Sequence, residues 1–225
     1  MRSTHEAIVL RRTDYGEGDR IINLLTPDLG KVSAMAKGVR KPKSKLAGGI
    51  EPFSLLNVSL LRGRSELYTL VSSQMVRHYD AITLDYTRLT LASLVLKRVN
   101  QLAETLNEPS VFELLKLSLE AINDDKVSPH LAETWFHLQY LRVTGHALNT
   151  QRDSNGQKLA AEKRYNFSLS DMVFVEHPSG EFGVDHLKLL RLMETQTART
   201  AGRVSGVGEV LGECAALLRI LNEAG

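Results

Sequence analysis

The chain has 225 residues, 43% of them hydrophobic and 24% charged, which is the composition of an ordinary soluble protein. The formal net charge is +2, but the charges are unevenly distributed. Residues 1–80 contain 13 Lys and Arg and 8 Asp and Glu, whereas the remaining residues contain 15 and 18. We therefore expect the N-terminal part to bind a polyanion. The single cysteine, Cys214, excludes an internal disulfide framework, and no apolar run approaches the roughly 20 residues of a membrane helix, so we expect a cytoplasmic protein with no membrane partner.

Residues 6–72 show the two-residue periodicity of β-strands, in runs that are separated by turns. The expected strands are residues 7–12, 20–26, 31–37, 53–61 and 66–72. Between the second and third strands, Pro27 and Gly30 occupy the second and fourth positions of a turn, which predicts a hairpin. Five short antiparallel strands fit a small closed barrel, because closure removes exposed sheet edges. We predict an OB-type barrel, an architecture that commonly binds single-stranded nucleic acid.

A basic loop follows the third strand. Three glycines and one proline between residues 38 and 49 disfavour a helix or a central strand, so the loop is expected to be exposed. The span from residue 31 to residue 45 contains no carboxylate and six cations: Lys31, Lys37, Arg40, Lys41, Lys43 and Lys45. A run of cations of this kind is often only a solvated loop. Proteins that bind single-stranded nucleic acid also use such cations to contact the phosphates along the strand.

From about residue 80 the apolar period changes from two to nearly four, which predicts helices. The stripe of the first helix is expected to contain Leu84, Leu91, Leu94, Val95, Val99 and Leu102. Ser110 and Glu113 predict a capping box at the start of a second helix, and Ser128 followed by proline predicts the start of a third. We therefore expect an α+β protein with a barrel at residues 1–78 and a helical domain at residues 79–225.

The C-terminal half of the chain also contains a non-helical segment. Residues 145–183 are polar and are predicted to form a loop followed by a small hairpin around residues 172–175. Further helices are expected around residues 187–193 and 210–221, and the apolar side of the last one makes Cys214 a buried structural thiol.

The candidate nucleic-acid contacts lie in the predicted barrel. The six cations of residues 31–45 would contact phosphates, with Arg62 and Arg64 on the last hairpin turn as a second rim. Tyr15 and Tyr68 could stack on bases, whereas Phe53, just after a proline at a strand start, fits the barrel core better. The five cations of residues 37–45, each contacting one phosphate, predict that affinity for single strands falls with salt with a log-log slope of about −3.5.

The helical domain offers a weaker candidate for a protein partner. Trp135, Phe136 and Tyr140 lie on one predicted helix, and with Arg98 and Arg142 they could receive an apolar, acidic peptide tail. The competing interpretation is that these aromatic side chains fill the core of the helical bundle.

No constellation of residues indicates catalysis. The glycines of residues 206–212 imitate a dinucleotide-binding fingerprint, but they follow no strand, and the chain has no nucleotide phosphate loop. His130 and His137 could share a helix face, but they lack nearby carboxylate or thiol partners for a metal. We expect no enzymatic activity, no metal and no cofactor. Three competing functions stay open at this point: a metal-dependent nuclease, an OB-type RNA binder, and a protein adaptor without direct DNA binding.

Several motifs resemble the N-terminal domain of the bacterial RecO family of recombination mediators. They are Ala-Ile-Val-Leu from residue 7, Tyr15-Gly-Glu with Asp19, residues 25–31, and Ala-Lys-Gly-Val-Arg-Lys-Pro-Lys-Ser-Lys from residue 36 with Glu51-Pro-Phe. The resemblance implies an OB-fold that binds single- and double-stranded DNA, a helical C-terminal domain and a cytoplasmic, nucleoid-associated protein. It further implies annealing of strands coated by single-strand-binding protein, contact with the C-terminal tail of that protein, and help for RecA loading together with RecR.

The resemblance is less complete in the C-terminal domain. Many members of the RecO family carry a four-cysteine zinc module between the C-terminal helices, but residues 145–183 of this chain contain no cysteine. The hairpin is therefore expected to be free of zinc and held by packing, as in those members that likewise lack the cysteines.

Overall fold

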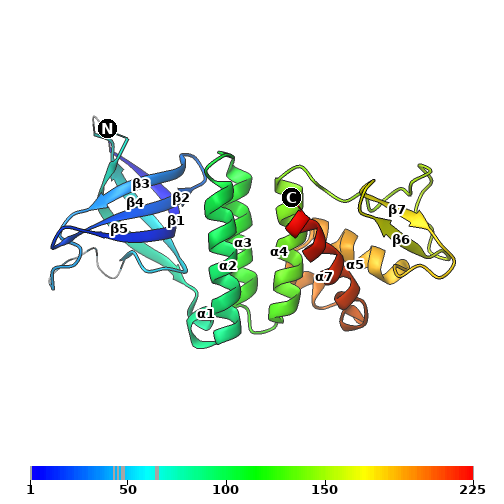
Figure 1. Ribbon diagram of the computed structural model, residues 1–225. Helices are drawn as coiled ribbons and strands as arrows, with labels where there is room; N and C mark the ends of the chain where they lie inside the picture. Colours follow the sequence, from blue (N-terminus) through cyan, green and yellow to red (C-terminus); the bar gives the residue numbers. More distant parts are fainter. Residues whose placement is uncertain (1, 43, 45, 47–48, 64–65, 225) are drawn as a thin grey trace. The chain divides into compact units, whose positions relative to one another are not determined.

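The computed structural model describes residues 2–42, 44, 46, 49–63 and 66–224 (Figure 1). The chain divides into two compact units, Met1–Asn123 and Asp124–Gly225. The first unit begins with the strands β1 (Arg2–Tyr15), β2 (Asp19–Thr26), β3 (Gly30–Ala36), β4 (Ser54–Leu61) and β5 (Tyr68–His78). They close into a barrel in the order β1-β2-β3-β5-β4, with β1 antiparallel to both β2 and β4 and with β3 parallel to β5. The prediction of a five-stranded OB-type barrel is confirmed, but the expectation that all the strands are antiparallel is wrong, because the barrel closes through the parallel pair of β3 and β5.

The barrel core follows directly from the alternation of apolar residues along the strands. Each strand turns every second side chain inward. The inward residues form one apolar cluster that contains Ala7, Val9, Ile22, Leu24, Ala34, Ala36, Leu56, Val58, Leu60 and Leu70. The small side chains of Ala34 and Ala36 leave room for the larger ones of the neighbouring strands in a narrow barrel.

The predicted turn between β2 and β3 depends on a glycine. Gly30 has a φ of +64°, a conformation that glycine adopts readily. A Cβ atom at this position would lie 1.8 Å from Oδ1 of Asn107. The turn therefore requires glycine both for its backbone conformation and for the close approach of the segment that follows α2.

Three helices complete the first unit: α1 (Asp80–Leu84), α2 (Tyr86–Leu102) and α3 (Pro109–Asn123). The helices α2 and α3 pack against each other, with contacts to β1, β2 and β3 (Figure 1). Leu91, Val95 and Val99 are buried, as the predicted stripe requires. The strands end at His78, and these three helices belong to the same compact unit as the barrel.

Two local predictions for this region are wrong. Leu84 is 86% exposed, because Asp85 ends one helix and begins the next, its carboxylate accepting a hydrogen bond from the Arg88 amide at 2.9 Å. Leu94 is also exposed, because at about 100° per residue it lies at the edge of the buried face of α2. The capping box does not form, because α3 already begins at Pro109 and the hydroxyl of Ser110 donates to Glu108 instead.

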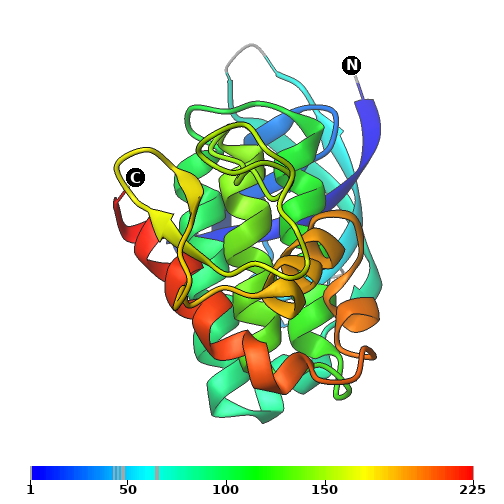
Figure 2. The same ribbon diagram turned by 90° about the vertical axis from the view of Figure 1, so that its right-hand side faces the viewer.

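The second unit contains the helices α4 (Pro129–Val143), α5 (Val184–Thr195), α6 (Ala198–Ala201) and α7 (Val207–Ala224). Ser128 caps α4 by accepting a hydrogen bond from the amide of Leu131 at 3.2 Å, as predicted. The helix α7 packs against α4 and α5 (Figure 2). Cys214 is buried in α7, and this burial raises the pKa of its thiol to about 12, so the thiol is structural rather than reactive.

The predicted hairpin is present as β6 (Tyr165–Ser168) and β7 (Val173–Glu176). Its core is aromatic, since the ring of Phe174 makes edge-to-face contacts with Phe167 and Phe182 at centroid distances of 5.0 and 5.6 Å. The buried carboxylate of Asp153 accepts hydrogen bonds from the amides of Asn155 and Gln157 at 2.9 and 2.8 Å. Aromatic packing and a backbone-capping carboxylate thus organise this cysteine-free segment.

Candidate nucleic-acid interface

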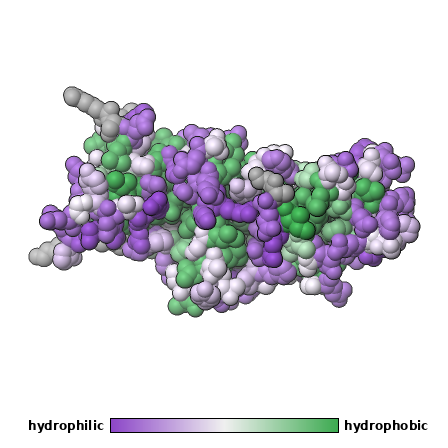
Figure 3. Space-filling view, viewed as in Figure 1, coloured by the Kyte–Doolittle hydropathy of each residue, from purple (hydrophilic) through white to green (hydrophobic). Residues whose placement is uncertain are grey.

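The first element of the candidate interface is a pair of linked loops at one end of β3. The turn between β1 and β2 meets the start of the loop between β3 and β4. The amide of Gly38 donates to Oδ1 of Asp19 at 2.7 Å, and the amide of Arg40 donates to the carbonyl of Gly18 at 3.0 Å. These bonds fix the backbone while the side chains of Lys37, Arg40 and Lys41 remain exposed. Figure 3 shows hydrophilic residues gathered at this end of the barrel.

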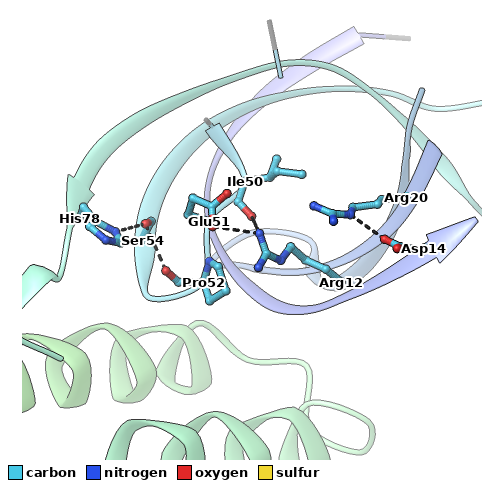
Figure 4. Close-up of polar contacts among 8 residues, drawn as sticks. All are labelled: Arg12, Asp14, Arg20, Ile50, Glu51, Pro52, Ser54 and His78. Atoms are coloured by element: carbon cyan, nitrogen blue, oxygen red, sulfur yellow. Dashed lines mark hydrogen bonds and ion pairs between the residues drawn. The ribbon is translucent and has the colours of Figure 1, made fainter. Parts of the chain in front are cut away.

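Arginine–carboxylate pairs surround these loops (Figure 4). Asp14 accepts from Nε of Arg20 at 2.8 Å and pairs with Arg40 at 3.5 Å. The hydrogen bond from Arg20 and the nearby charge of Arg40 hold the pKa of Asp14 below its ordinary value. Arg12 donates to Glu51 at 3.0 Å and to the carbonyl of Ile50 at 3.4 Å, which ties β1 to the end of the loop.

Sequence reasoning missed Arg12 and Arg20. A signal was present for Arg20, since Asp14 and Arg20 are direct partners in the antiparallel pairing of β1 with β2. Opposite charges placed symmetrically about a short hairpin turn are expected to pair across the two strands. For Arg12 no local signal existed, because Glu51 lies 39 positions further along the chain.

The other end of β3 carries a groove. It has a volume of about 530 Å³ and is lined by Lys31, Val32, Ser33, Arg62, Glu66, Leu67 and Tyr68. The groove brings together three of the predicted contact residues, Lys31, Arg62 and Tyr68, which are far apart in the sequence. The parallel pairing of Ala34 with Tyr68 places the start of β5 beside β3 and so forms this wall.

The outer face of β2 and β3 connects the two ends. Because Ala34 and Ala36 point into the core, Lys31, Ser33 and Met35 lie on the opposite face of β3. From Lys31 to Lys37 this face is roughly 20 Å long at about 3.3 Å per residue. The hydroxyl of Ser33 donates to Asn23 of β2 at 3.2 Å, so the middle of the face is polar.

The remaining predicted contacts have different surroundings. Tyr15 is 55% exposed at the end of β1, so its ring is accessible. Tyr68 is half-buried and packs partly against the barrel core. Phe53 is buried, but it is not part of the apolar cluster that forms the barrel core. Lys43, Lys45 and Arg64 lie outside the described residues.

Trp135, the aromatic residue of α4 that was a candidate for binding a protein partner, is buried in the second unit. Trp135 is only 3% exposed, and its indole nitrogen donates to the carbonyl of Gln196 at 2.8 Å. Trp135 is therefore a core residue, which corrects its assignment as a partner-binding side chain. Arg142 is exposed but donates to the carbonyl of Glu194 at the end of α5, and Arg98 is a half-buried residue of α2 in the first unit.

Two kinds of feature do not occur in the part of the chain that the structure describes. No group of three or more His, Cys, Asp or Glu side chains in that part is arranged to hold a metal ion. None of the helices there has the length and apolarity that crossing a membrane would require.

A five-stranded OB-type barrel with cations at both ends of its outer face, followed by a helical unit, is an architecture used by nucleic-acid-binding proteins. The model of the "Recombination protein O N terminal" family matches residues 1–79, and that of the "Recombination protein O C terminal" family matches residues 83–223. Together these matches cover nearly the whole chain, and the chain belongs to the RecO family.

Similar proteins carry the name "DNA repair protein RecO". One from Dehalococcoides mccartyi (strain 195) is 35% identical over 161 residues, which are 71% of this chain and 63%, less than two thirds, of that relative. One from strain CBDB1 of the same species is 30% identical over 221 residues, covering 95% of this chain and 87% of the relative. One from a Nocardioides species is 33% identical over 174 residues, covering 75% and 71%. Family membership gives the chain a role in DNA repair.

Proposed function

We propose that this chain is a non-catalytic mediator of DNA repair that binds single- and double-stranded DNA without sequence specificity and anneals complementary strands. The observation that carries the proposal is the outer face of β2 and β3, which joins a basic loop pair at Lys37–Lys41 to a groove that contains Lys31 and Arg62. This face is roughly 20 Å long and has the polar pair Ser33 and Asn23 at its middle, and this length between two groups of cations suits an extended strand with regularly spaced phosphates.

The side chains of the outer face explain why binding would not depend on the base sequence of the DNA. Lysine and arginine side chains contact phosphates, which are the same for every base. Few aromatic side chains are available for stacking, and Tyr15 and Tyr68 would accept any base. Annealing follows because the same cations reduce the repulsion between two strands held at one surface.

The proposed partners follow from the family. The DNA substrate would be coated by single-strand-binding protein, whose C-terminal tail the chain would contact, and RecR would act with it to promote RecA loading. Because Trp135 is buried, we do not assign it to the tail, and Arg98 of the first unit and Arg142 of the second are separate candidate contacts.

The test is annealing of two complementary oligonucleotides that are precoated with single-strand-binding protein. We compare the wild-type chain with the double variant Lys37→Glu/Lys41→Glu. The wild type should accelerate annealing and the variant should not, and the salt slope for single-strand binding should become shallower by about 1.4, or about 0.7 for each lost phosphate contact.

The matched control is Lys126→Glu/Lys158→Glu, which makes the same change in net charge at exposed lysines of the second unit. This control should behave as the wild type does. Equal loss of annealing in both double variants would mean that only overall charge matters, and no acceleration by the wild type would remove the mediator function.

A further inference from the structure

The ammonium group of Lys31 already has an anionic partner inside the first unit. It donates to the carboxylate of Glu104, which follows α2, and to the backbone carbonyl of Asn100 at 3.5 Å. The Lys31 side chain is only 14% exposed, whereas that of Glu104 is 63% exposed. A mostly covered cation is thus neutralised by a carboxylate that stands largely in solvent.

The two ends of the outer face differ in whether their lysine side chains are paired with a carboxylate. Among the described residues, Lys37 and Lys41 form no ion pair, and both side chains are exposed. Lys31 lines the groove with Ser33, Arg62 and Tyr68 but has its charge engaged by Glu104. The groove therefore holds the residues of a phosphate subsite, and its lysine is bound by Glu104, a carboxylate that is not among the residues lining the groove.

A carboxylate and a phosphate group make the same demand on an ammonium group, since both present anionic oxygens that accept charge-assisted hydrogen bonds. We propose that Glu104 occupies the position of a phosphate at the Lys31 subsite, so that a DNA strand must displace this side chain before it can use that end of the face. This inference rests on the proposed function and adds an intramolecular competitor to it.

Displacement is physically accessible. An ion pair whose carboxylate is mostly solvated is screened and weakly held. A strand that is anchored by phosphates at Lys37 and Lys41 presents its next phosphates to Lys31 at a high local concentration. Binding should therefore begin at the loop end of the face and extend to the groove only after Glu104 leaves, and Glu66 on the groove wall adds further repulsion.

The experiment compares Glu104→Gln with Glu108→Gln in the full chain. Both variants remove one negative charge from the segment between α2 and α3, but Glu108 accepts a hydrogen bond from Ser110 and does not contact Lys31. Binding to a fluorescent oligothymidylate is measured by anisotropy over a series of salt concentrations. Glu104→Gln should bind more tightly than the wild type at low salt, and its salt slope should be steeper by about 0.7, the value for one added phosphate contact.

The double variant Lys31→Gln/Glu104→Gln should lose this gain, because the released cation is absent. A gain in affinity cannot arise from partial unfolding, which would lower affinity.

If the wild type binds and Glu104→Gln behaves as Glu108→Gln does, the inference is wrong and the proposed function stands. If Glu104→Gln binds more weakly than the wild type, Glu104 positions Lys31 for DNA and the competitor role is wrong. If the wild type binds no DNA, both the proposed function and the inference fall.

Discussion

Tyr79 shows how a single side chain can be placed well for packing and poorly for hydrogen bonding. It is fully buried next to the start of α1, and its hydroxyl has no partner among the described residues. Burial raises the pKa of this hydroxyl well above its ordinary value, so it stays neutral. The guanidinium of Arg77 lies 5.3 Å from the ring centroid, an interaction that needs only the aromatic face.

We therefore expect Tyr79→Phe to stabilise the chain. The variant keeps the ring and its contact with Arg77 but removes a buried polar group that gains no hydrogen bond. The free energy of unfolding should rise by about 1 kcal/mol, measured by urea denaturation. A loss of stability of similar size would show that a bound water pairs the hydroxyl in solution.

At the scale of elements, the two turns that follow β1 and β2 use glycine in different ways. Gly16 and Gly30 both have a φ near +60°. A Cβ atom at Gly16 would meet nothing within 4 Å, whereas one at Gly30 would lie 1.8 Å from Asn107. Both turns contact other parts of the chain, but only at Gly30 does the close approach leave no room for a side chain.

This difference predicts unequal effects of the same substitution. Gly16→Ala should cost about 1 kcal/mol, because alanine disfavours a positive φ. Gly30→Ala should cost more, because the segment after α2 must also move away from the β2–β3 turn. Urea denaturation of the two variants tests this, and equal losses would mean that Asn107 moves aside at no cost.

At the scale of the whole molecule, the proposed function and its competitors differ in how affinity depends on strand length. Affinity for oligothymidylates should rise with length and level off once a strand fills the face, at a site size of about 4–16 nucleotides for one OB-type barrel. The measurement is an anisotropy titration with oligonucleotides of increasing length at fixed salt. A protein adaptor would show weak binding without this length dependence, and tighter binding of oligouridylates would favour an RNA-binding function.

The sequence by itself determined the local features of this protein. The two-residue alternation predicted five strands, and the change of period near residue 80 predicted the helices, because both patterns depend on which side chains one element must bury. The cap at Ser128 and the turn at Gly30 were also predictable, since each depends on a few adjacent residues. The local predictions at Leu84 and Ser110 were wrong because helix boundaries shift by a few residues in response to packing.

The tertiary structure alone decided which charges are available and which aromatic side chains are covered. Lys31 appeared in the sequence as one of six equivalent cations, but the fold places it beside Glu104, 73 positions away. Trp135 could have been a core residue or a surface anchor until the carbonyl of Gln196, 61 positions away, accepted its indole hydrogen bond. Contacts of this kind depend on how the chain closes on itself, and no periodicity within one element records them.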